Sequence, residues 1–371
     1  MRVDETIHST GAVPMKRKIS QKQIATDLGV SQSLVSLVLN GRREGISEAS
    51  YKRIWNHAVE SGYAPKGMQP GHAPGQDVTD SFVGVVLRAG IKLATQSNTY
   101  SHVHQGMYRV LRKTGISTIF LGSEGDLDEV EFLRVLKNRN PLRGIVVFGE
   151  VKPSFIKAIT ELEQGVVSVY ANFPGLCHSI LPNERQAVDQ LVTHLNGLGH
   201  TRIAWLGGNS DLGRNRARCQ ALREAMHLRG LDLPKNFVVN TQGADRQEGY
   251  DSARTLLAGT PPGHQPTAWI CHNGLMARGA LQGALEQGLR VPQDFSIVAT
   301  DMTRVCEEIH PYLTGASADP ERIGQKAAEL LTQHPEDHED HVFSDLVLPS
   351  TLTVRETCGC APKVDITSGA Q

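Results

Sequence analysis

From Ser81 onward the chain alternates short apolar runs with stretches long enough for amphipathic helices, and this alternation constrains the fold most. Runs that are apolar throughout are typical of parallel strands covered by helices on both faces. We therefore predict an α/β region with strands at 82–87, 117–121, 144–148, 166–170, 202–206, 237–239, 268–271 and 296–299.

Eight strands are too many for one small sheet, and a turn-rich break at Asn172–Gly175 divides them four and four. We expect two doubly wound lobes, with a ligand cleft between the carboxyl edges of their sheets. The predicted domains are a flexible tail at 1–15, a helical domain at 16–63, a linker at 64–80, the two-lobed domain at 81–357 and a second tail at 358–371. Within the two-lobed domain, the first lobe takes about 81–173 and 306–335, and the second about 174–305 and 336–357.

Composition excludes several classes of protein. We find no run of the roughly 18 to 20 apolar residues that a membrane span needs, and no signal-peptide pattern at the start, so we expect a cytoplasmic protein. The cysteines are scattered, and the one-residue spacing of Cys358 and Cys360 does not suit zinc. His334, His338 and His341 lie in an acidic stretch to which we assign no ligand role, and we predict neither metal nor cofactor.

Charge is distributed unevenly along the chain. Residues 1–70 hold ten Lys or Arg against six Asp or Glu, although the whole chain has a formal net charge of −1. A local basic excess attracts phosphates by releasing their counterions. The N-terminal region is therefore the candidate for binding nucleic acid.

Two short helices joined by a tight turn are predicted within this basic region. Ser20 is placed to cap a helix over Gln21–Leu28, Gly29 can end it in a left-handed conformation, and Ser31 can cap the next helix over Gln32–Leu39. A third helix follows from Glu48 to about Ser61, capped by Ser47 and ended by Gly62. The predicted core of these helices comprises Ile24, Ala25, Leu28, Val30, Val35, Val38, Tyr51, Ile54, Trp55 and Val59.

The opposite face of the second helix stays polar. Gln32, Ser33 and Ser36 project from its start, which is the part that enters the major groove in helix-turn-helix proteins. Glutamine can bind adenine through two hydrogen bonds, and serine can bind several base edges. An ordinary helical hairpin remains the alternative for this pattern by itself.

The residues of this region closely resemble the DNA-binding head of the lactose-repressor (LacI/GalR) family. The resemblance rests on Ile24, Ala25, Leu28, Gly29, Val30, Ser31, Ser33, Val35, Ser36, Val38, Leu39, Asn40 and Gly41, then Ile46, Ser47 and Glu48, and finally Gly62, Tyr63 and Pro65. It implies contacts with double-stranded operator DNA by Lys18, Ser20, Ser31, Gln32, Ser33, Ser36, Leu37, Asn40 and Arg42.

Two departures from the family pattern stand out. Leu37 occupies a position where the family commonly has a long polar side chain, so it can contact only a thymine methyl group or a sugar, and the operator should differ from the common one. Relatives also carry a short hinge helix with a leucine wedge in the linker. Gly67, Pro70 and Gly71 oppose such a helix, with Met68 a weak substitute for the wedge, so we expect a mostly disordered linker at 64–80.

The α/β region resembles the family's sensor domain, which is similar to periplasmic sugar-binding proteins. Four strings carry this match, namely 198–208, 291–298, 310–314 with Gly324, and 348–356. The resemblance implies a homodimer joined through the sensor lobes, whose DNA affinity a small polar effector controls. We expect the effector to be a sugar or sugar derivative. The resemblance also implies repression, which is the commoner mode of regulation in the family.

Effector contacts are carried over only where the strings align. Arg214 precedes Ala221 and Leu222 by the spacing of the family's ligand-gripping arginine, and a guanidinium group suits vicinal hydroxyls or a carboxylate. Asp301 matches the family aspartate that accepts hydrogen bonds from hydroxyls. The resemblance also implies Asn273, although Gly274 replaces the usual acid beside it, and Tyr100 as a stacking aromatic. The alternatives are a surface charge for Arg214 and a helix cap for Asp301.

The chain carries none of the common catalytic motifs, so we predict no enzymatic activity. The predicted function is sequence-specific, effector-controlled regulation of transcription. The alternative is a cytoplasmic sugar-binding protein, or a sugar-modifying enzyme, with a fused helical head.

Overall fold

A computed structural model describes residues 20–39, 45–60, 81–88, 99–124, 142–161, 165–261, 263–301, 303–308, 310–332 and 343–362. The N-terminal helices form one compact unit, and the two sheets with their helices form a second. The predicted tail at 1–15, the linker at 64–80, Lys18, Asn40, Arg42 and the three histidines of the acidic stretch lie outside the described residues. No helix in the described ranges is long and apolar enough to cross a membrane.

Three helices build the N-terminal unit, α1 (Gln21–Leu28), α2 (Gln32–Leu39) and α3 (Glu48–Glu60). The Ser20 hydroxyl accepts from the Gln23 amide at 3.2 Å and caps α1, while Gly29 ends it at φ 65°. Ile24, Val35 and Ile54 are fully buried where the helices meet. The three predicted helices are therefore present, and five of the predicted core residues are buried, namely Ile24, Ala25, Val35, Val38 and Ile54.

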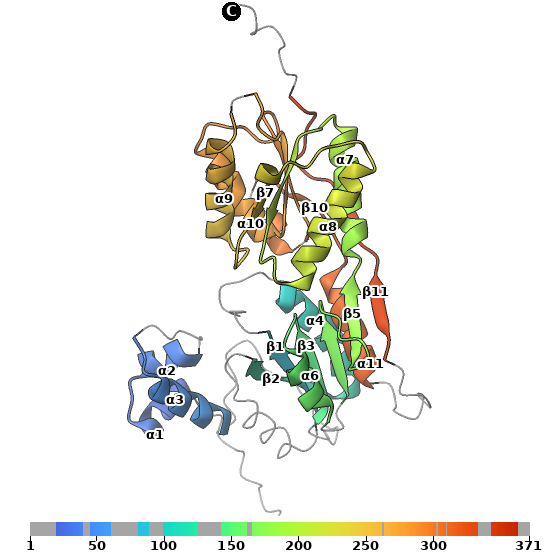
Figure 1. Cartoon of the computed structure of the whole chain (residues 1–371). Coiled ribbons are helices and arrows are strands. Elements are labelled where there is room, and N and C mark those ends of the chain that lie inside the picture. The colour runs from blue at the N-terminus through green and yellow to red at the C-terminus, as the bar shows by residue number, and fades with distance from the viewer. Residues whose placement is uncertain are drawn as a thin grey trace, which may run out of the picture. The chain divides into compact units, whose positions relative to one another are not determined.

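The second unit contains two six-stranded sheets (Figure 1). The first sheet has the order β11-β5-β4-β3-β1-β2, and all its strands run parallel. Its strands are β1 (Phe82–Leu87), β2 (Ser117–Ser123), β3 (Leu142–Phe148), β4 (Val166–Val169), β5 (His178–Pro182) and β11 (Asp345–Leu348). The helices of this lobe are α4 (Thr99–Leu111), α6 (Pro153–Thr160) and α11 (Pro320–Thr332).

The second sheet has the order β12-β10-β9-β8-β6-β7, and only β12 runs antiparallel to its neighbour. Its strands are β6 (Ile203–Gly207), β7 (Val238–Asn240), β8 (Ala268–Cys271), β9 (Ser296–Ala299), β10 (Thr314–Ser317) and β12 (Thr351–Thr353). The helices are α7 (Glu184–Gly197), α8 (Gly213–His227), α9 (Arg246–Ala258) and α10 (Gly274–Leu285). Trp205 and Trp269 are fully buried in this lobe, as predicted for core residues.

Each sheet has an apolar cluster on both faces. In the first lobe, α4 and α11 cover one face and α6 the other; in the second lobe, α9 and α10 lie opposite α7 and α8. Burial on both faces explains why the eight predicted runs read as continuously apolar. The predicted α/β fold class with two parallel-sheet lobes is confirmed.

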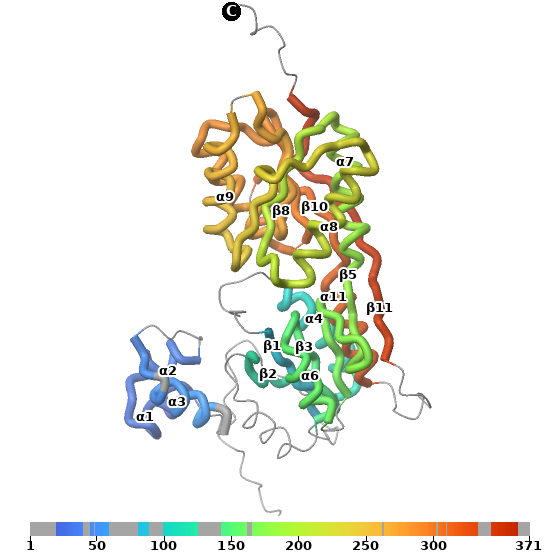
Figure 2. The backbone as a smooth tube through the Cα atoms, viewed as in Figure 1, coloured from blue at the N-terminus to red at the C-terminus, as the bar shows by residue number. Residues whose placement is uncertain are grey.

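The predicted division of the chain between the lobes is wrong at three strands. The chain passes from one sheet to the other between β5 and α7, between β10 and α11, and between β11 and β12 (Figure 2). Consequently β5 and β11 belong to the first lobe, and β10 belongs to the second. These three strands and β12 escaped prediction because they are short and, in β11 and β12, partly exposed, so they show no continuous apolar run.

The predicted C-terminal tail also begins too early. His200 is fully buried, and its Nε2 lies 3.0 Å from the Gly359 carbonyl oxygen. The Gly359 amide donates to Ser296 Oγ at 3.0 Å, and the Ala361 amide donates to the Leu198 carbonyl at 2.8 Å. Residues 358–361 are thus bound to the second lobe, and His200 holds this segment in place.

Candidate functional sites

The N-terminal unit presents the predicted polar edge on α2. Gln32 and Ser33 are exposed, and Leu37 is 38% exposed, while Val35 and Val38 on the opposite side of the same helix are buried. The Ser31 hydroxyl accepts from the Leu34 amide at 3.2 Å and so caps α2. Ser20 and Ser31 therefore have a structural role as caps, in addition to their predicted DNA contacts.

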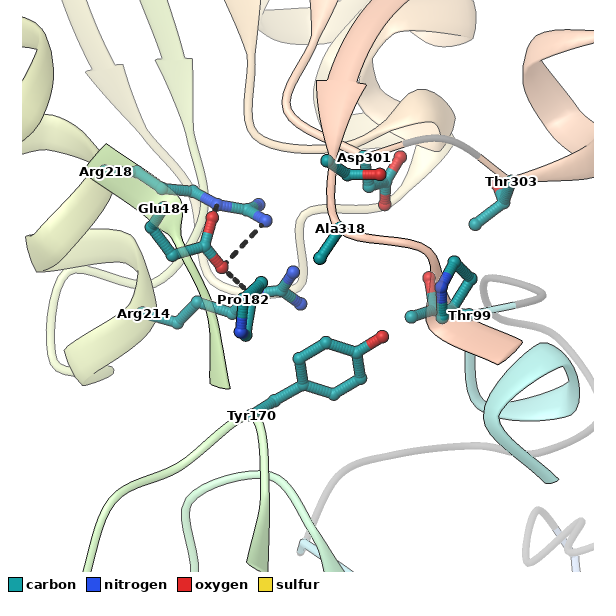
Figure 3. Close-up of a pocket in the computed structure, with 11 residues that line it drawn as sticks. Thr99, Tyr170, Pro182, Glu184, Arg214, Arg218, Asp301, Thr303 and Ala318 are labelled. Carbon is teal, nitrogen blue, oxygen red and sulfur yellow. Dashed lines mark hydrogen bonds and ion pairs between the residues drawn. The ribbon is translucent and has the colours of Figure 1, made fainter. Parts of the chain in front are cut away.

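The second site is a pocket between the two lobes, where both sheets end at their carboxyl edges. Figure 3 shows side chains from several elements pointing into it. Its lining comprises Thr99, Tyr170, Pro182, Glu184, Arg214, Arg218, Asp301, Thr303, Ser317, Ala318 and Pro320. Two of the three chain crossings, at 182–184 and 317–320, thus form part of the wall.

Arg214 and Arg218 lie four residues apart on α8, so both face the pocket. The Arg214 side chain is 23% exposed and lies over the Tyr170 ring, with Cζ 4.3 Å from the ring centroid. The Arg218 side chain is only 1% exposed. Its Nη2 donates to the Thr300 carbonyl at 3.0 Å, and its Nη1 donates to the His272 carbonyl.

Glu184 accepts from both arginines. Its Oε2 receives Arg218 Nε at 2.5 Å, and its Oε1 receives Arg218 Nη2 at 3.1 Å and also Arg214 Nε (Figure 3). Burial by itself raises the pKa of Glu184, but the two guanidinium groups outweigh burial and lower the pKa below its usual value. Glu184 is therefore ionised at neutral pH.

Asp301 supplies the second carboxylate of the pocket. Its Oδ1 accepts from the Gly274 amide at 2.7 Å, at the first residue of α10. Burial raises the pKa of Asp301, whereas Arg218 and this hydrogen bond act in the opposite direction. Asp301 therefore lines the pocket and also accepts from the first amide of a helix, and its contact with an effector stays a prediction.

The structure separates the other two predicted effector residues from the lining. Asn273 caps α10, where Oδ1 accepts from the Met276 amide and Nδ2 donates to the Ala244 carbonyl, both at 2.8 Å. Tyr100 stacks on Phe148 and meets the Tyr170 ring edge-on, so its neighbour Thr99 lines the pocket instead.

Sequence reasoning missed Glu184, Arg218 and Tyr170. Glu184 follows β5, a strand that was not predicted. In contrast, the position of Tyr170 in the pocket could have been predicted, because Tyr170 ends a predicted strand at the carboxyl edge of the sheet. Its φ of 68° is unusual for a residue with a side chain, and such strain is concentrated at functional sites.

The pocket is narrow, and interlobe contacts close it. Its cavity volume is about 10 Å³, room for about one water molecule. Glu150, which follows β3 of the first lobe, accepts from the Gly213 amide of α8 at 2.6 Å. A sugar-sized ligand therefore needs the lobes to separate before it can enter.

These features define a class of protein in which a unit of three helices is joined to a unit of two parallel-sheet lobes with a polar pocket between them. A family model described as a periplasmic binding protein-like domain matches residues 192–358. The HTH-type transcriptional repressor PurR of Aliivibrio fischeri is 26% identical over 330 residues, which cover 87% of this chain and 94% of that protein. The ribose operon repressor of Escherichia coli is 27% identical over 315 residues, which cover 84% of this chain and 92% of that protein.

Solved structures share the fold. The CelR–cellobiose complex has a TM-score of 0.64 at 23% identity, and the lac repressor dimer bound to operator and the anti-inducer ONPF has 0.63 at 21%. Each match covers 92% of this chain and 100% of the other. The chain is thus similar to these repressors over most of its length, and the likeness to the solved structures shows the fold.

Proposed function

We propose that this protein is a sequence-specific DNA-binding transcriptional regulator, a repressor like its named relatives, whose operator affinity a small polar effector controls. The proposal rests on the presence of two sites in one chain. One is the exposed polar edge of α2, and the other is the interlobe pocket lined by two arginines and two carboxylates. A catalytic role finds no support, since the named relatives are repressors.

Effector control follows from the position of the pocket at the chain crossings. A ligand that contacts Arg214 and Asp301 and also the first-lobe residues Thr99 and Tyr170 needs more room than the described pocket offers, so it binds only when the lobes lie further apart. Such a ligand shifts the population toward that wider arrangement. Operator affinity changes with it if the two arrangements hold the heads differently, and the effect must be reciprocal.

We propose that the active form is a homodimer. One head of this size offers a single short recognition helix, and tethering two heads raises their combined affinity for a two-part operator. Sedimentation of the protein on operator DNA tests this, because a complex with only one chain would exclude the dimer. Since the proposed partner is chromosomal DNA, we place the protein in the cytoplasm.

The decisive experiment is selection of genomic fragments by the purified protein, followed by measurement of binding to the selected operator and its single-base variants. The Gln32→Ala variant should lose about 1 to 3 kcal/mol of discrimination at one base pair, because it loses a base-reading amide. Gln220→Ala, an exposed glutamine of α8, is the matched control and should bind as the wild type does. Absence of any preference among fragments would refute the regulator proposal, and an equal loss on all DNA would show that Gln32 reads no base.

A further inference from the structure

The two arginines of the interlobe pocket are matched by two carboxylates. Arg214 and Arg218 face Glu184 and Asp301, and all four residues line the pocket. The formal charge of the lining is therefore zero. Effectors of a two-lobed sensor can be neutral sugars or anions such as sugar acids and sugar phosphates, and the charge of the lining discriminates between them.

Glu184 is held firmly by contacts within the protein, so a ligand does not readily displace it from the two arginines. It is the first residue of α7, where the helix dipole favours a negative charge, and the neighbouring Asn183 caps the helix by accepting from the Gln186 amide at 3.0 Å. Its side chain is 11% exposed and accepts from Arg218 through both carboxylate oxygens. A ligand carboxylate that displaced it would leave Glu184 buried without its partners, which is costly.

Four of the five N–H donors of Arg218 are already used within the protein, so at most one is left for a ligand. Nε and Nη2 donate to Glu184, Nη2 also donates to Thr300, and Nη1 donates to His272. Arg214 is the more exposed of the two, and Glu184 accepts from its Nε. The cationic group nearest to an incoming ligand is thus already paired with an internal carboxylate.

We propose that Glu184 determines effector specificity by neutralising the arginine pair, so that the pocket accepts uncharged polyhydroxylated ligands and rejects anionic ones. Arg214 and Asp301 then act as a donor and an acceptor for hydroxyl groups rather than as a site for a carboxylate or phosphate. This inference rests on the proposed effector-binding function, and it assigns the chemical class of the effector.

The test is a change in the charge of the pocket without a change in its size. Glu184→Gln gives the lining one net positive charge, and Glu224→Gln is the matched control, because Glu224 pairs with Arg185 outside the pocket. The full-length proteins are titrated with glucose, glucuronate and inorganic phosphate by calorimetry and thermal shift. E184Q should bind glucuronate about ten- to a hundredfold more tightly than the wild type, as expected for one unscreened charge at close range, and E224Q should not.

The inference is overturned if the wild type binds glucuronate or phosphate as tightly as E184Q does, or if E184Q gains no affinity for either anion. Should E184Q fail to fold, Arg214→Gln provides the opposite test, because Glu184 remains paired with Arg218. The pocket then carries a net negative charge, so the affinity of this variant for glucosamine relative to glucose should be about tenfold higher than that of the wild type. An unchanged ratio of the two affinities would contradict the role assigned to the charge balance.

These outcomes are separate from those of the DNA experiment. Gain of anion binding by E184Q without any preference among genomic fragments would uphold the inference about the pocket and refute the regulator proposal. Preference among fragments without a gain of anion binding would refute the inference alone.

Discussion

Two arginines one helical turn apart serve different purposes in this protein. Arg218 is almost fully buried and is bound to Glu184 and to the carbonyl groups of His272 and Thr300, which come from the ends of neighbouring segments of the second lobe. Arg214 is partly exposed and packs on Tyr170 of the first lobe. We infer that Arg218 stabilises the lobe, whereas Arg214 meets the ligand.

Removal of each arginine should therefore affect stability differently. Arg218→Ala leaves Glu184 with Arg214 as its remaining cationic partner and removes one donor from each of two buried carbonyl groups, and we expect it to lower the free energy of unfolding by about 3 to 5 kcal/mol. Arg214→Ala leaves Glu184 paired with Arg218 and should cost about 1 kcal/mol. Urea denaturation of both variants measures the difference. Equal losses would show that Arg218 has no special structural role.

At the scale of elements, glycine residues allow the backbones of two helices in each lobe to pack in direct contact. A Cβ atom at Gly324 of α11 would lie 1.8 Å from the Val103 carbonyl oxygen of α4, and one at Gly106 of α4 would lie 1.8 Å from the Glu321 carbonyl oxygen. The same arrangement recurs in the second lobe, where a Cβ atom at Gly279 of α10 would lie 1.8 Å from the Arg246 carbonyl oxygen of α9. None of these glycines can accept a side chain without separation of its helices.

Alanine at one of these positions should be far more harmful than alanine at a helical glycine with open space around it. We expect Gly324→Ala to destabilise the protein by about 1 to 3 kcal/mol or more, because backbone atoms must move. Gly197→Ala in α7, where a Cβ atom would meet nothing within 4 Å, should be neutral or stabilise by up to about 1 kcal/mol. Thermal unfolding measures both changes. A similar small effect for both variants would contradict the close packing of α4 and α11.

At the scale of the sensor as a whole, the two lobes touch through a few polar contacts at the start of α8. Glu150 of the first lobe accepts from the Gly213 amide, and Arg214 lies over Tyr170. A carboxylate at a helix N-terminus is favourable, and here it comes from the opposite lobe. Both contacts must break when the lobes separate.

Loss of the Glu150 carboxylate should favour separation of the lobes. In Glu150→Ala, we expect amide hydrogen exchange to rise about tenfold both at the first turn of α8 and at Tyr170, whose amide donates to the Ile180 carbonyl. Glu161→Ala, an exposed glutamate of the same lobe, is the control. Faster exchange at α8 alone would mean that Glu150 only caps the helix and does not hold the lobes together.

Most helices and strands of this fold could be predicted from the local sequence. The three N-terminal helices follow from caps at Ser20 and Ser31 and from a buried stripe, and the eight predicted strands follow from continuous apolar runs. Both signals are local, because a cap or an apolar run acts over a few residues. Arg214 and Asp301 were expected from the family resemblance, which rests on local strings of residues, and both line the pocket, while their contact with an effector stays a prediction.

Only the tertiary structure decided to which lobe β5, β10 and β11 belong. Strand pairing joins residues that are far apart in sequence, so the local sequence of a short strand does not indicate its partner. That division also determines the pocket, since two of the crossings form its wall and Glu184 follows one of them. The charge of the site depends on this long-range arrangement. The local pattern determined the elements of this protein, and the pairing of distant segments determined the chemistry between its lobes.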